Sequence, residues 1–165
     1  MRILSISIVL RILLIISFAL VAFMQVKDTQ LSDMFLNDEI SFEYYKENEI
    51  NTSMYGLIFV ILALINSWYT NYLSKKRNNG RILMREIVIP EMNLNDDERE
   101  AEITAKSAKA AFSVIIIATF IVLAFFTLVI PYLDNPLPYS VFTIAALPII
   151  GLLTYYITYR VLYLR

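Results

Sequence analysis

The stretch that decides the fold runs from Ala110 to Ile130 and reads AAFSVIIIATFIVLAFFTLVI, without one charged residue. A helix rises about 1.5 Å per residue, so about 20 apolar residues cross the roughly 30 Å hydrocarbon core of a bilayer. The stretch lacks the alternating pattern of a barrel strand, and backbone groups in lipid must be hydrogen-bonded within their own segment. We therefore predict a transmembrane helix here.

Three other stretches have the same length and character, and they cover residues 3–24, 54–73 and 137–162. The chain of 165 residues is 58% hydrophobic with a mean hydropathy of +0.61. Soluble domains contain only about 45 to 50% apolar residues. The sequence therefore predicts an all-α, multi-pass protein of the cell membrane, with one four-helix transmembrane domain over residues 1–165. Four crossings place both termini on the same side.

The first span carries one charge, Arg11, about 12 Å along a helix that begins near Ile3. A charge at the bilayer centre costs about 2.5 to 3.5 kcal/mol on insertion scales, but a long side chain at this depth can reach the headgroups. Because Arg2 precedes an apolar run, the first span could instead be a cleaved signal peptide. Arg11 argues against that alternative, since it interrupts the apolar run. Arg11 is predicted either to reach the membrane surface or to act as a functional intramembrane charge.

The charges between the spans predict the topology. The connection over residues 25–53 holds two basic and seven acidic side chains and is predicted to be an acidic extracellular loop. The connection over residues 74–109 begins with the basic run Lys75 to Arg77, so it is predicted to be a charged cytoplasmic loop. Both termini are then cytoplasmic. Tyrosines near the predicted inner ends, among them Tyr155 and Tyr159, are interpreted as belt residues of the membrane interface.

The cytoplasmic loop is predicted to end in a long helix that continues into the third span. Asn95 can cap this helix, and no proline or glycine interrupts residues 93–130. Glu102 and Lys106 stand four residues apart, the spacing of a favourable ion pair on one helix face. Before the helix, residues 82–89 are rich in β-branched side chains and predict a short extended segment. The predicted fold is thus four transmembrane helices with a cytoplasmic helical extension of the third.

The start of this helix resembles a known pattern. The run Asp97-Glu98-Arg99, followed by Ile103 and by Lys109-Ala110-Ala111-Phe112, resembles the charged helix before a membrane span in a family of small prokaryotic membrane proteins with a domain of unknown function. The resemblance covers residues 97–112 and implies a cytoplasmic helix that leads into a span. It makes Asp97, Glu98 and Arg99 candidates for contact with a partner protein. Lys106 of the same helix is a fourth candidate.

Polar side chains inside the spans form a second set of candidates. Asn66 and Asn71 of the second span can hydrogen-bond to a neighbouring helix. Alternatively, they can line a transport path together with Pro148 of the fourth span, where the proline removes a backbone donor. No aspartate or glutamate lies inside any predicted span, which disfavours an ion-coupled transporter that acts alone.

The composition limits the chemistry. The chain has no cysteine and no histidine, which removes thiol nucleophiles, imidazole acid–base catalysis and Cys/His zinc sites. A net charge of −1 gives no field that favours nucleic acid as a partner. The acids over residues 96–102 would bind a metal only if they shared one direction, which helical spacing prevents. We therefore expect no catalytic residue, cofactor or metal ligand, and no enzymatic activity.

Two functional hypotheses fit these observations. The first is a non-enzymatic integral membrane protein, an accessory, immunity or regulatory subunit that sits in the lipid bilayer. It would contact another membrane or cytoplasmic protein through residues 74–109, where basic and acidic side chains are dense. The alternative is a small oligomeric channel, or the membrane subunit of a transporter. A homo-oligomer is compatible with either hypothesis.

Overall fold

The structure, a computed structural model, describes residues 2–77, 98–133 and 136–164. These residues form helices and no strand. The helices are, in chain order, α1 (Arg2–Leu36), α2 (Phe42–Asn48), α3 (Thr52–Arg77), α5 (Glu98–Leu128), the 3-10 helix η1 (Ile130–Tyr132) and α6 (Pro136–Leu164). Helices α1, α3, α5 and α6 are long and apolar enough to cross a membrane, which confirms the predicted all-α fold with four membrane-length helices. The predicted extended segment over residues 82–89 and the Asn95 cap lie outside the described residues.

Local chemistry fixes where the helices begin and end. At the end of α1, Asp38 takes a positive φ of 59°, and the amide of Glu39 donates to the carbonyl of Met34 at 2.9 Å. This is the usual way in which a left-handed residue closes a helix. Helices α2 and α3 begin at side-chain caps, because Ser41 accepts from the amide of Tyr44 and Asn51 accepts from the amide of Met54. Each turn at this end of the molecule is therefore locally specified.

Helix α1 extends beyond the span predicted at residues 3–24. Residues 25–36 of the acidic connection continue the same helix, and residues 42–48 form α2. The hydroxyls of Thr29 and Ser32 donate back to the carbonyls of Gln25 and Asp28 at 3.0 Å, so these side chains stay within the helix. Most of the predicted acidic loop is therefore helical.

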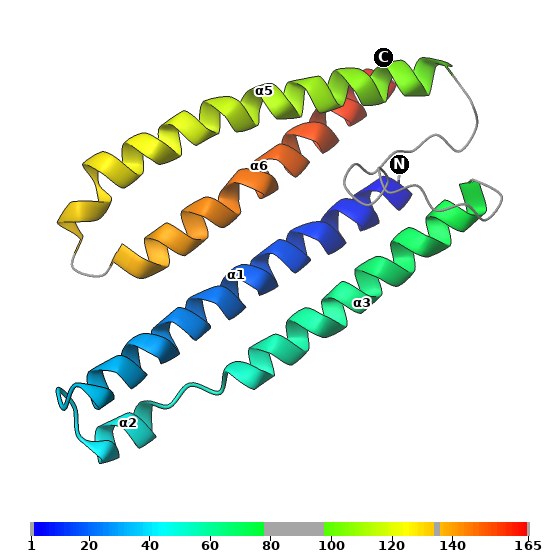
Figure 1. Ribbon diagram of the computed structural model, residues 1–165. Coiled ribbons are helices and arrows are strands. Elements are labelled where there is room, and N and C mark those ends of the chain that lie inside the picture. The colour runs from blue at the N-terminus through cyan, green and yellow to red at the C-terminus, as the bar shows by residue number, and fades with distance from the viewer. Residues whose placement is uncertain (1, 78–97, 134–135, 165) are drawn as a thin grey trace.

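The four long helices lie side by side in the order α5, α6, α1, α3 (Figure 1). Helix α6 packs between α5 and α1, whereas α3 packs on α1 alone among the other described long helices. This is an open row and not a closed bundle of four helices. Lipid chains are as apolar as leucine, so a helix face in a bilayer needs no second protein neighbour. The outward face of α3 can therefore remain exposed to the membrane.

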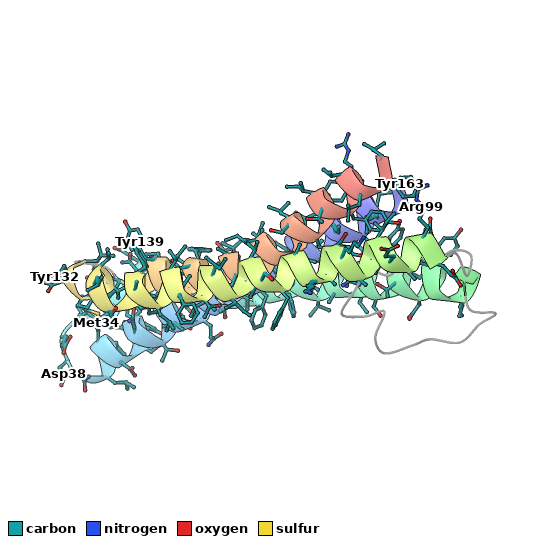
Figure 2. The ribbon with its side chains drawn as sticks, turned by 90° about the horizontal axis from the view of Figure 1, so that it is seen from above. Met34, Asp38, Arg99, Tyr132, Tyr139 and Tyr163 are labelled. Atoms are coloured by element: carbon teal, nitrogen blue, oxygen red, sulfur yellow. The ribbon has the colours of Figure 1, made fainter. Side chains whose placement is uncertain are left out.

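The core lies where α1, α5 and α6 meet, at the end of the row that holds both chain termini (Figure 1). Its buried side chains are Leu4 and Ile8 of α1, Ile103 and Ala111 of α5, and Tyr155 and Tyr159 of α6. Figure 2 places Arg99 and Tyr163 together at this end, and Asp38, Tyr132 and Tyr139 at the other. Both termini are therefore on the same side of the helix row, as four crossings predict. We call this the terminal end, and the opposite end the α2 end.

Candidate interaction surface

The charged first part of α5 has a buried face. Ile103, Ser107 and Ala111 are buried, and they follow one another at four-residue spacing along one side of the helix. Ser107 is fully enclosed, and its hydroxyl donates to the carbonyl of Ile103 at 2.8 Å. This bond satisfies a hydroxyl that would otherwise be costly to bury. The start of α5 is thus packed against the protein and does not project as a free helix.

The other side of the same segment carries exposed charges, which we call the charged stripe. It comprises Glu98, Arg99, Glu102 and Lys106, all exposed. The predicted pair between Glu102 and Lys106 is present at 2.7 Å, although both side chains remain more than 60% accessible. Water screens an exposed pair of this kind, so it contributes little to stability. The stripe is therefore a surface feature and adds little to the stability of the fold.

Three of the four predicted contact residues thus share one accessible surface. Glu98, Arg99 and Lys106 lie on the charged stripe at the terminal end, where Figure 2 labels Arg99. Asp97 lies outside the described residues. Helix α5 continues without a break from these charges into its apolar part and ends at Leu128. At about 1.5 Å per residue, this helix extends about 46 Å.

Two tyrosines hold α5 in this position, and their interpretation as belt residues was wrong. Tyr155 and Tyr159 of α6 are 4% and 2% exposed, and their ring centroids are 6.1 Å apart. They belong to the core that also contains Ile103. The signal in the sequence was their four-residue spacing, which places both rings on the face of α6 that also carries Gly151. Their position near a span end concealed this role.

Arg11 is buried between helices. It is 8% exposed and lies one turn beyond the buried residues Ser7 and Ile8 of α1. It lies near Tyr155 of α6. A polar contact joins the same two helices, since the hydroxyls of Ser5 and Tyr156 are 2.9 Å apart. Arg11 is therefore part of the contact between α1 and α6, as an intramembrane charge facing protein should be.

The intramembrane polar candidates of α3 lie apart from the apolar groove beside Pro148. Asn66 and Asn71 are partly buried, and the Oδ1 atom of Asn66 is buried without a hydrogen-bond partner among the described residues. Pro148 lines an apolar groove of about 710 Å³ with Phe18 of α1 and Phe59 of α3. Neither asparagine lines that groove.

The acidic side chains of the described residues are not gathered into a cluster. Within residues 2–77, 98–133 and 136–164, no group of three or more acidic side chains is placed to hold an ion. Glu98 and Glu102 share one face of α5, whereas Glu100 lies on another, so the three carboxylates do not converge. Comparisons with protein-family models, with curated proteins and with solved structures gave no match, so the resemblance over residues 97–112 has no family model behind it.

Proposed function

We propose that this protein is a non-enzymatic membrane subunit that binds another protein through the charged stripe of α5. One observation carries the proposal. The segment that holds Glu98, Arg99 and Lys106 is packed through Ile103, Ser107 and Ala111, yet its charges face outward. The backbone of this surface is therefore held in place before a partner binds, so binding requires little further loss of backbone entropy.

The energetics of the stripe support a role in binding. Solvent-exposed charges contribute little to folding, so four of them on one surface are not explained by stability. Charges at a contact surface instead steer encounter and discriminate between partners. The proposed partner is a membrane or cytoplasmic protein with complementary charges. In the proposed topology the protein sits in the cell membrane with both termini in the cytoplasm, and the stripe lies at the inner membrane surface.

A photocrosslinking experiment tests the proposal without removing a charge. A photoreactive amino acid at Ala105, an exposed position beside the stripe, is expected to capture one reproducible partner in native membranes. Reversal of the stripe by Glu98→Lys with Lys106→Glu should abolish that capture. The matched control reverses the same charge types at the α2 end, by Glu47→Lys with Lys46→Glu, and should leave capture unchanged.

Two results would overturn the proposal. Capture that is indifferent to stripe reversal would show that the charges do not select the partner. Capture of a second copy alone would point to the oligomeric channel, in which case flux through liposomes containing the purified protein is the next measurement. The channel has less support, because neither Asn66 nor Asn71 lines the apolar groove beside Pro148.

A further inference from the structure

A second polar feature lies at the α2 end, at the far side of the molecule from the charged stripe (Figure 1). There the last part of α1, helix α2 and the start of α3 line an open cavity of about 460 Å³. Two carboxylates line it although they are far apart in the sequence, Asp28 of α1 and Glu49 after α2. The other polar side chains of its lining are Tyr45, Asn51, Thr52 and Ser53. We call this the polar cavity.

The walls of the polar cavity are held by contacts outside it. The ring of Tyr45 stacks on the ring of Phe35 of α1, with centroids 5.1 Å apart. The ring of Phe42 also packs against Phe35, with centroids 6.0 Å apart. These contacts fasten α2 to the end of α1, and the Asn51 cap fixes the first turn of α3. The lining is therefore set in place by packing, which is what a preformed binding site requires.

The charge of the polar cavity is not compensated by the described residues. Neither Asp28 nor Glu49 forms an ion pair within the parts of the chain that the structure describes. The hydroxyls of Thr52 and Ser53 add oxygen acceptors beside the two carboxylates. Carboxylates are acceptors only, so such a lining favours a cation that carries hydrogen-bond donors.

The size and composition of the cavity indicate which kind of cation it suits. A calcium ion takes six to eight oxygen ligands at about 2.3 to 2.6 Å, and no group of three acidic side chains is gathered for one in the described residues. A volume of 460 Å³ lies within the range of about 300 to 1,000 Å³ typical of sites for organic ligands.

We propose that the polar cavity binds the ammonium group of an organic cation, with Asp28 and Glu49 as its charge partners. Such a group could come from a polyamine or from a lysine side chain of a cationic peptide, and both present the same chemistry. The proposed extracellular position of the α2 end would make this a site for a ligand arriving from outside the cell. This inference is independent of the charged stripe and can fail without affecting it.

Calorimetric titration of the full-length protein in phosphatidylcholine nanodiscs tests the inference, with spermidine and trilysine as separate probes. At least one probe should bind saturably at one site per chain. Asp28→Asn and Glu49→Gln should each weaken binding by about tenfold or more, since each removes a hydrogen bond to a charged group. The matched controls Asp33→Asn and Glu47→Gln change the same residue types at nearby positions of α1 and α2 outside the cavity lining, and binding should stay within about twofold of the original.

Each outcome decides the inference. Binding of spermidine and trilysine, or of one of them, with loss confined to the two cavity variants supports the site and identifies the source of the ammonium group. Equal weakening by all four substitutions would show diffuse attraction to an acidic surface and overturn the site. Binding of Ca²⁺ without either amine, or no binding at all, would also overturn it. Unchanged circular dichroism of Asp28→Asn and Glu49→Gln shows that a loss is not a loss of fold.

Discussion

Gly151 of α6 lies directly against Ile115 of α5, so that a β-carbon at position 151 would stand 2.9 Å from the Cγ1 atom of Ile115 and still closer to its Cδ1 atom. The missing side chain lets the two helix backbones approach, as small residues do in membrane helix pairs. This contact joins the outermost helix of the row to the rest of the core. It is a position where one added methyl group has a measurable cost.

Substitution of Gly151 by leucine should therefore destabilise the protein. The added side chain must displace Ile115 or separate the helices, and overpacking of this kind costs about 1 to 3 kcal/mol. Denaturant unfolding in detergent micelles, followed by circular dichroism, measures the change. Gly56→Leu in α3 is the control, because nothing lies within 4 Å of a β-carbon at that position. Equal losses at both positions would contradict a special role for the α5–α6 contact.

Truncation of Tyr159 should be the most damaging change among the tyrosines. Its ring is 2% exposed and packs in the core with Tyr155 and Ile103, so Tyr159→Ala leaves a cavity and should cost about 3 kcal/mol. Tyr132→Ala makes the same chemical change at a side chain that is 84% exposed and should be nearly neutral. The midpoints of thermal unfolding of the two variants compare them directly. If Tyr132→Ala were as harmful, the core would not lie where the structure has it.

Arg11 should contribute to stability, because it belongs to the contact between α1 and α6. Removing one partner of a buried polar contact leaves the other unsatisfied, which costs about 1 to 3 kcal/mol, or about 3 to 5 kcal/mol for an ion pair. We expect Arg11→Leu to unfold at a lower denaturant concentration than the original protein. The control is Arg160→Leu, which makes the same change at an exposed position of α6 and should be nearly neutral. Equal unfolding midpoints for Arg11→Leu and the original protein would mean that the charge does not hold α1 to α6.

The orientation in the membrane can be read with single cysteines, because the chain contains none. In intact cells, a membrane-impermeant maleimide should label Lys46→Cys in α2, since the acidic end is expected outside. Ala105→Cys, beside the charged stripe, should react only after the membrane is permeabilised. Both positions are exposed in the structure, so accessibility to the reagent is not limited by packing. The reverse pattern would invert the topology and remove the cytoplasmic partner from consideration.

The number of membrane helices was predictable, because an uninterrupted apolar run of about 20 residues has few other stable solutions. The ends of those helices were not. Helix α1 runs on to Leu36 because no helix-breaking residue precedes Asn37, and hydropathy detects only the end of the apolar run. Hydropathy reports where lipid begins, while hydrogen bonding decides where the helix stops.

The order of the helices could not be predicted for a different reason. The long helices are apolar around most of their circumference, so the sequence does not mark which face meets protein and which meets lipid. For the same reason Tyr159 was interpreted as an interfacial residue. The stripe on α5 was easier to find, because charge pairs with helical spacing, such as Glu102 and Lys106, remain readable in a segment outside the apolar run.

The core of this protein has a consequence for its synthesis. Ser5 and Tyr156 meet across the contact between α1 and α6 although 151 positions separate them, and the core around Leu4 and Tyr159 spans a similar interval. A ribosome delivers α1 before α3, α5 and α6, so α1 enters the bilayer before α6, one of its two long neighbours, has been made. During that interval, Arg11 must be accommodated by lipid headgroups, water or the insertion machinery. Assembly of the core is therefore a late event in biogenesis, because it requires both α1 and α6.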